Sequence, residues 1–410
     1  MKDIEWSYLG TWHTNLLSAS CFAHNDDVNV FTRHKLPRAV VGYKELDDNV
    51  YVTKAQRKLT ENFFYSKVAN KEWDYLNGFV SAARNAANDF LNANYNFNSL
   101  DSFKLFTEKL KPMMTYWIRV IEADVGIEKA LVEKCQAEEV EVYAALAQMK
   151  PMDLEFVAKN KELAKLAKSH NEWHLQDSEI DAFLEKYAWT GINVFFGEPY
   201  DKKKLLAELA IFEPSLKPKV SAQGLDWPEL KVAGDFAFLR FHFAESLCKI
   251  TFQFWSLLER LGRENSLTFE EVKLHSCREL LAGYFQSKQV LRERMKHSAI
   301  IVIGDEEKIV SGNAFAKEIE QMQSEQSYAA PVEGELHGLP TSPGIVRGTA
   351  RLVMSSSEMY KVKPGDILIA TETTPEYVSA MKIVGAIVTN QGGITSHAAI
   401  VSRELGVPCV

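Results

Sequence analysis

The sequence lacks the features that mark several large classes of protein. It has no run of about 18 apolar residues that could cross a membrane, and its start, Met1-Lys2-Asp3-Ile4-Glu5, has no apolar signal-peptide core. Basic residues are outnumbered, and the formal net charge of -8 indicates no basic surface for nucleic acid. We therefore expect a soluble, cytoplasmic protein with no membrane partner and no nucleic-acid partner.

Cysteine is scarce and scattered along the chain. The five cysteines are odd in number and form no CxxC pair, which favours free thiols in a reducing compartment over disulfides. His170 and His174 stand four residues apart, but no third ligand accompanies them. We expect no metal site in this chain.

The pattern along the chain predicts an α+β multidomain protein. With 410 residues, of which 46% are hydrophobic, it is long enough for two or three domains with cores of their own. We assign residues 1–310 to a mostly helical domain, with a small sheet within residues 1–60. The strand-like segments of that sheet are residues 27–31, 38–43 and 49–52. Residues 311–333 are polar and weakly patterned, which is typical of a linker, and residues 334–410 form a second, small domain.

One helix, over residues 235–261, is predicted to be central. Apolar residues recur in it at spacings of three and four and give one core face, made of Leu239, Phe243, Leu247, Ile250, Phe254, Leu257 and Leu261. On the opposite side, His242, Glu245 and Lys249 share a polar stripe, in which Glu245 and Lys249 have the order that favours an ion pair. The stripe is either an acceptor-binding surface or an ordinary solvated helix face.

The most informative stretch lies near the C-terminus. Residues 385–390 are apolar and β-branched, which predicts a buried strand, and Gly392 and Gly393 follow them. Paired glycines at this place predict a turn from the strand into a helix. His397 then falls in the first turn of that helix.

Both ends of this predicted helix are signalled by the sequence. Thr395 or Ser396 can cap its start with a hydroxyl group. Gly406 is placed to end it in the left-handed conformation, and Pro408 follows where a helix cannot continue.

A histidine at a helix start has a specific chemical use. Unpaired backbone N–H groups and the positive end of the helix dipole favour a phosphoryl group there, and neutral imidazole is a nucleophile near pH 7. The same pattern also fits a helix-capping turn with an ordinary surface histidine. On the functional interpretation His397 is catalytic, and the predicted phosphate-binding residues are Gly392, Gly393, Thr395, Ser396 and Arg403.

This stretch resembles the phosphohistidine signature of the mobile domain of phosphoenolpyruvate-utilising enzymes. Three further blocks resemble the same domain, in the same order: residues 338–348, 363–370 and 373–376. The resemblance implies a small β/β/α swivelling domain whose histidine is phosphorylated by a nucleotide-binding domain and then moves to a distant acceptor site. His397 is the position that matches this histidine.

The resemblance also implies cofactors and partners. No glycine-rich nucleotide-binding domain precedes residue 1, so ATP and Mg²⁺ are expected to act through an ATP-grasp-type domain or subunit outside this sequence. The chain is therefore expected to be inactive alone. It ends at Val410, so the last strands of the family's domain are expected to be missing.

Three functions are compatible with the resemblance. A helical region ahead of the histidine domain, with no barrel after it, resembles the arrangement in rifampicin phosphotransferase and glutamine kinase. That arrangement favours a phosphotransferase that moves a phosphoryl group from ATP through His397 to a small molecule, with His242, Glu245 and Lys249 at the acceptor site. The first alternative is a phosphoenolpyruvate synthase-like enzyme, and the second is a phosphohistidine carrier that serves another protein.

Overall fold

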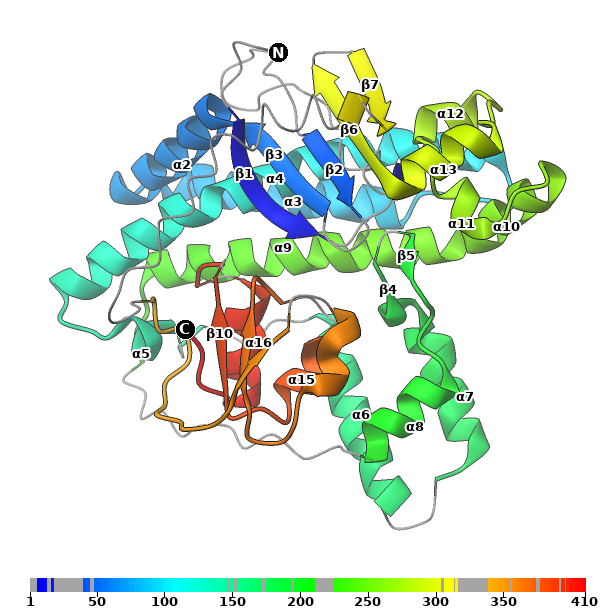
Figure 1. Ribbon diagram of the computed structural model, residues 1–410. Coiled ribbons are helices and arrows are strands. Elements are labelled where there is room, and N and C mark those ends of the chain that lie inside the picture. The colour runs from blue at the N-terminus through cyan, green and yellow to red at the C-terminus, as the bar shows by residue number, and fades with distance from the viewer. Residues whose placement is uncertain are drawn as a thin grey trace.

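The computed structural model has long helices and a five-stranded sheet up to residue 315, and a smaller part with three strands at its C-terminus. The residues described are 6–12, 16–17, 40–44, 48–146, 148–149, 154–171, 175–193, 195–210, 224–303, 306–312, 314–315, 338–353, 356–373, 377–390, 392–394 and 396–410. We call the described residues up to 315 the helical unit and residues 338–410 the C-terminal unit (Figure 1). The predicted linker, residues 311–333, lies mostly outside the described residues, and so does the predicted strand at residues 27–31.

A five-stranded antiparallel sheet lies at one side of the helical unit. Its order is β1-β3-β2-β6-β7, from β1 (Trp6–Trp12), β2 (Val40–Lys44), β3 (Asp48–Thr53), β6 (His297–Ile303) and β7 (Glu306–Ser311). β2 and β3 coincide with two of the predicted strands. The sheet is not confined to residues 1–60, because every residue of β2 pairs with a residue of β6. The apolar, β-branched run Ala299-Ile300-Ile301-Val302-Ile303 is the signal for β6 that the sequence analysis missed.

Long helices fill the rest of the helical unit. They are α2 (Lys54–Ala69), α3 (Trp73–Leu91), α4 (Leu100–Ala137), α9 (Pro228–Gln253) and α10 (Trp255–Glu264). Shorter helices follow at α5 (Val142–Leu146), α11 (Phe269–Val272), α12 (Cys277–Leu281) and α13 (Lys288–Lys296). Phenylalanine rings from α2, α3, α4 and α9 meet in the core, where Phe64, Phe79 and Phe236 lie 5.1 to 5.5 Å apart between ring centroids.

The predicted central helix forms, with different ends. Pro228 occupies the first turn of α9, where its missing N–H costs nothing, and the helix breaks at Phe254 before α10 begins. The prediction of one helix from residue 235 to 261 was therefore wrong in its bounds. Its core face is confirmed, because all seven predicted residues are buried.

Three helices form a satellite packing group beside α9. They are α6 (Glu155–Asn171), α7 (Asp177–Tyr187) and α8 (Lys202–Ala210). Leu163, Phe183, Tyr187, Tyr200 and Leu205 build a separate apolar cluster among them. The 3-10 turn η1 (Ala188–Gly191) and the short strands β4 (Ile192–Asn193) and β5 (Phe196–Gly197) connect α7 with α8.

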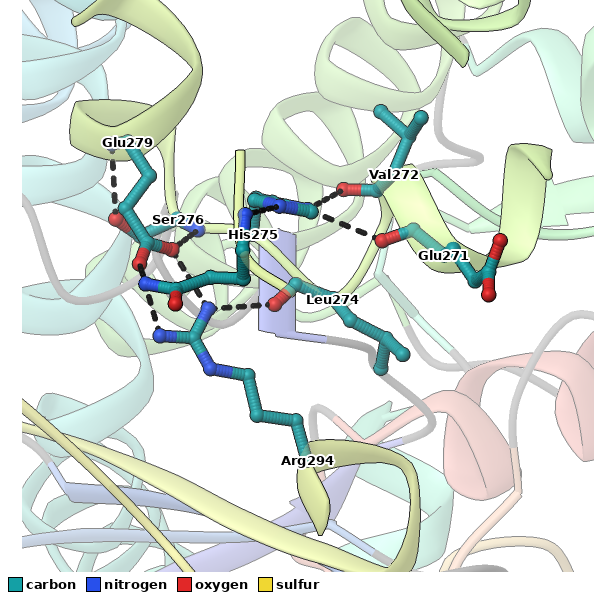
Figure 2. Close-up of polar contacts among 8 residues, drawn as sticks. Glu271, Val272, Leu274, His275, Ser276, Glu279 and Arg294 are labelled. Atoms are coloured by element: carbon teal, nitrogen blue, oxygen red, sulfur yellow. Dashed lines mark hydrogen bonds and ion pairs between the residues drawn. The ribbon is translucent and has the colours of Figure 1, made fainter. Parts of the chain in front are cut away.

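A buried polar network joins α11, α12 and α13 of the helical unit (Figure 2). Arg294 of α13 makes two hydrogen bonds of 2.7 and 2.8 Å to the carboxylate of Glu279. His275 places Nδ1 3.0 Å from the carbonyl oxygen of Glu271, and its Nε2 accepts a hydrogen bond of 2.9 Å from the backbone N–H of Gln286. The N–H group of Gln286 can only donate, so His275 is neutral with its proton on Nδ1.

The C-terminal unit holds a three-stranded parallel sheet of order β10-β9-β8. Its elements are β8 (Ala350–Leu352), η2 (Ser356–Lys361), β9 (Ile367–Ala370), α15 (Val378–Met381), β10 (Ala386–Thr389) and α16 (His397–Leu405). α16 follows β10 as the sequence predicts. In Figure 1 this unit lies along α9, on the side away from the five-stranded sheet.

The described helices contain none that is both long enough and apolar enough to cross a membrane. Cys135, Cys248, Cys277 and Cys409 are buried free thiols. Within the described part of the chain, His, Cys, Asp and Glu side chains do not gather in a group of three or more that could hold a metal ion.

Candidate active site around His397

The start of α16 is built by side-chain capping and by glycine. Ser396 is the N-cap and its Oγ accepts a hydrogen bond of 3.2 Å from the N–H of Ala399, as predicted. Gly392 has a φ of 120°, a conformation that L side chains rarely adopt. Gly406 ends the helix with a φ of 71°. Thr395, the other predicted cap, lies outside the described residues.

His397 is the first residue of α16, and it is buried between the two units. Its Nδ1 lies 2.8 Å from Oγ1 of Thr373, three residues after the end of β9. From the other side, the ring of Phe241 on α9 approaches to 5.8 Å between centroids. Only 9% of the surface of His397 remains exposed. The imidazole is thus held by its own unit and covered by the helical unit.

Burial keeps the imidazole of His397 neutral, and a nearby positive charge adds to the effect. Burial lowers the pKa of His397 to about 3, and the positive charge of Arg240 acts in the same direction. Arg240 is itself held by Asp124 of α4, with 2.6 Å between Nη1 and Oδ2. A neutral imidazole keeps one ring nitrogen with a free electron pair, which is the form that attacks phosphorus.

The turn before α16 is gripped from both units. Glu128 of α4 accepts a hydrogen bond of 3.1 Å from the N–H of Ile394, and Arg403 of α16 donates one of 3.0 Å to the carbonyl oxygen of the same residue. A Cβ atom on Gly393 would lie 1.9 Å from Oε2 of Glu128, so the end of the Glu128 side chain would have to move away if this residue were not glycine. Burial raises the pKa of Glu128, while the bond from Ile394 opposes the rise.

Apolar and charged contacts extend this interface. Ile400 of α16 packs with Leu154, Ala237 and Phe241 of the helical unit. Farther along, Lys382 of the C-terminal unit forms an ion pair of 2.8 Å with Glu208 of α8, and both side chains are largely buried. The two units are therefore docked with His397 inside the contact.

The predicted acceptor stripe lies beside this contact. His242 stacks on Phe238, with 5.1 Å between centroids, and burial lowers its pKa, with the charges of Arg84 and Lys249 adding to the effect. Lys249 forms its ion pair with Glu155 of α6, and Glu245 accepts a hydrogen bond from the N–H of Glu155. Lys249 thus pairs with Glu155, at the start of α6, instead of with Glu245 as expected.

The stripe does not touch the histidine. Among the described residues, the imidazole of His397 is hydrogen-bonded to Thr373 and packs against the ring of Phe241. Neither contact involves His242, Glu245 or Lys249. Its role in acceptor binding stays a prediction, as do the phosphate-binding roles of Gly392, Gly393, Ser396 and Arg403.

Sequence reasoning missed the residues of the helical unit that meet His397. Asp124, Glu128, Arg240 and Phe241 lie in helices where charged and aromatic residues are common, so no local pattern distinguishes them. Thr373 had a signal, because it opens one of the blocks that resemble the phosphohistidine domain.

The comparison with known protein families bears on this site. Residues 362–410 match the family described as "PEP-utilising enzyme, mobile domain". The matched segment contains Thr373, the turn at Gly392 and all of α16. The resemblance inferred from the motif is therefore confirmed for this part of the chain.

Parts of the chain also match curated relatives. A probable phosphoenolpyruvate synthase of Archaeoglobus fulgidus is 41% identical over 152 residues, which is 36% of this chain and 19% of the relative. The phosphoenolpyruvate synthase of Pyrococcus furiosus is 52% identical over 97 residues, or 24% of this chain and 11% of the relative. The phosphoenolpyruvate synthase of Pseudomonas aeruginosa is 41% identical over 101 residues, or 25% and 12%. The chain thus spans less than a fifth of the length of these relatives.

Proposed function

We propose that this chain carries a phosphoryl group on His397 as part of a phosphoenolpyruvate synthase-like reaction. The observation that carries the proposal is a buried, neutral imidazole at the capped start of α16, inside the segment that matches the mobile domain. The names of the relatives favour phosphoenolpyruvate over the ATP-to-acceptor transfer that the sequence analysis preferred.

In the proposed step, Nε2 of His397 is the nucleophile, because Nδ1 is bonded to Thr373. The electron pair of Nε2 forms the N–P bond while the bond from phosphorus to the enolate oxygen of phosphoenolpyruvate breaks. The enolate takes a proton on carbon and leaves as pyruvate, and the reverse sequence makes phosphoenolpyruvate. Cations and backbone donors around the phosphoryl group would stabilise the transfer.

ATP and Mg²⁺ remain part of the proposal through an ATP-grasp-type domain or subunit. No residue described here is assigned to either of them. Transfer to a small molecule held by the helical unit is a second candidate, and the contact between Phe241 and His397 favours it, because it places the histidine on α9.

The test is to label the full chain with ³²P-phosphoenolpyruvate and, separately, with phosphoramidate, a reagent that phosphorylates histidine directly. We expect a label that is labile in acid and stable in base, and that is absent from His397→Ala. Full labelling of that variant would show that another residue is the carrier.

The labelled chain then separates the candidate functions. Loss of label to pyruvate supports the phosphoenolpyruvate synthase-like reaction. Loss to a member of a panel of antibiotics, amino-acid amides and 2-oxo acids other than pyruvate supports the second candidate. Transfer only to a protein would support a non-enzymatic carrier.

A further inference from the structure

The helical unit places a guanidinium group beside His397 that the unphosphorylated state does not use. Arg240 directly precedes Phe241, whose ring covers the imidazole. It is bonded to Asp124 of α4, one helical turn before Glu128, which accepts a hydrogen bond from the turn ahead of His397. The positive charge of Arg240 also lowers the pKa of His397. A cation next to a neutral, buried imidazole gains no attraction from it. It would gain one if the ring carried an anion.

The guanidinium is held in place and keeps donors to spare. Asp124 bonds Nη1 at 2.6 Å, and the side chains of the pair are 23% and 12% exposed. An arginine has five N–H donors in a planar fork. Within the described part of the chain, Arg240 uses one of them, in its hydrogen bond to Asp124. The remaining donors match the oxygens of a phosphoryl group, which arginine often binds through two bonds at once.

Other donors along the contact between the two units have partners of their own. The N–H of Ile394 bonds Glu128, and the side chain of Arg403 bonds the carbonyl of Ile394. Lys382 and Lys249 are paired with Glu208 and Glu155. Arg240 is thus the charged group of the helical unit best placed to meet a phosphoryl group on His397.

We propose that Arg240, fixed by Asp124, binds the phosphoryl oxygens of phospho-His397 when the two units are docked. The inference rests on the proposed function, because it requires that His397 be phosphorylated. It places in the helical unit a residue that binds the phosphoryl group while that group is still on His397, whatever the acceptor is.

The experiment is a ³¹P NMR titration of the full chain after phosphorylation with phosphoramidate. A nearby cation favours the phosphoryl dianion, so its pKa, ordinarily about 6, should be low in the wild type. Arg240→Gln should raise this pKa by about 1 unit. Arg240→Lys, which keeps the charge, should restore most of the shift. The matched control is Arg260→Gln, which removes the same charge from an ion pair with Glu264 on α10.

Asp124→Asn extends the test if Arg240→Gln does not fold. Removing the anion leaves the charge of Arg240 uncompensated, so the pKa of the phosphoryl group should fall below the wild-type value. Equal values in the wild type, Arg240→Gln and Asp124→Asn, with His397 labelled, would overturn the inference and leave the proposed function standing. If the wild type takes no label on His397, the proposed function fails and the inference fails with it.

Discussion

His275 and His397 are both buried histidines with a lowered pKa, yet the hydrogen bonds of their ring nitrogens differ. In His275 both nitrogens are engaged, Nδ1 with two backbone carbonyls and Nε2 with the N–H of Gln286. In His397 the hydrogen bond recorded among the described residues is on Nδ1, to Thr373. His275 lies wholly inside one unit, whereas His397 lies where two units meet.

The difference separates a structural histidine from the one that we propose carries the phosphoryl group. Burial is the largest cause of the lowered pKa in both, so burial alone does not identify a reactive group. What distinguishes His397 among the described residues is a ring whose hydrogen bond is on Nδ1, at a helix start, in the contact between the two units. The comparison predicts that changes at His275 affect folding and that changes at His397 affect chemistry.

The largest expected effect is on phosphorylation. His397→Ala should reduce label from phosphoramidate or phosphoenolpyruvate to background, because the attacking nitrogen is gone. His275→Ala should keep full labelling per folded molecule while its unfolding temperature falls. Labelling and thermal unfolding, measured on the same two samples, check the contrast, and the reverse pattern would abolish it.

The next effect is on the network around His275. Arg294→Met leaves the carboxylate of Glu279 buried without its cation, so the free energy of unfolding should fall by about 3 to 5 kcal/mol. Urea denaturation followed by circular dichroism measures this. The double variant with Glu279→Gln should recover part of the loss, and a single variant as stable as the wild type would contradict the assignment.

A smaller effect is expected at the glycine turn. Gly393→Ala puts a Cβ atom against the flexible end of Glu128, which can turn away at the expense of its hydrogen bond from Ile394, so the docked state should lose about 1 to 2 kcal/mol. Hydrogen exchange should become faster in α16 and in the facing part of α9, while label on His397 is retained. Adding Glu128→Ala removes the clash and should reverse part of the change, because the two residues are in contact.

Acid should weaken docking through His397. The pKa of its docked form is about 3, below the ordinary 6.5, so the neutral form is favoured in the contact. The stability that the neutral ring gives to the docked state is complete above pH 6.5 and is lost as the pH falls toward 3. At pH 5 the loss amounts to about 2 kcal/mol. Hydrogen exchange of α16 at pH 7.5 and 5 checks this, and His397→Gln should make docking less dependent on pH.

The smallest effect is expected at the ion pair between Lys382 and Glu208. Lys159 lies near the same carboxylate, and burial lowers its pKa to about 8, with Glu208 opposing this and Lys382 adding to it. In Lys382→Met, Lys159 still neutralises Glu208, so docking should lose only about 1 kcal/mol. A loss several times larger in hydrogen exchange would mean that Lys159 does not compensate.

The sequence predicted the local structure of α16 well and the interface poorly. Capping by Ser396, the end at Gly406 and the position of His397 follow from short-range rules that need no tertiary contact. The pairing of Arg240 with Asp124 joins residues 116 positions apart, so no spacing rule could have predicted it. The same holds for Lys249 and Glu155, 94 positions apart, whose contact displaced the expected pair with Glu245.

The sheet illustrates the same limit. β2 and β3 were found because strand-like segments stand between turns, but β6 and β7 follow a long helical region whose pattern dominated the prediction. Only the fold reveals that β6 lies beside β2. Periodicity finds elements, and their partners depend on contacts that are distant in sequence.

The strand order of that sheet bears on how the protein is made. β2 ends at Lys44 and its partner β6 starts at His297, so a ribosome must synthesise about 250 residues between the two before the sheet can close. Contacts of such long range slow folding, and until β6 emerges, one edge of β2 has no strand to pair with. The helices between them can pack earlier, because their contacts are closer in sequence. During synthesis, chaperone binding should therefore concentrate on the N-terminal strands until β6 has left the ribosome.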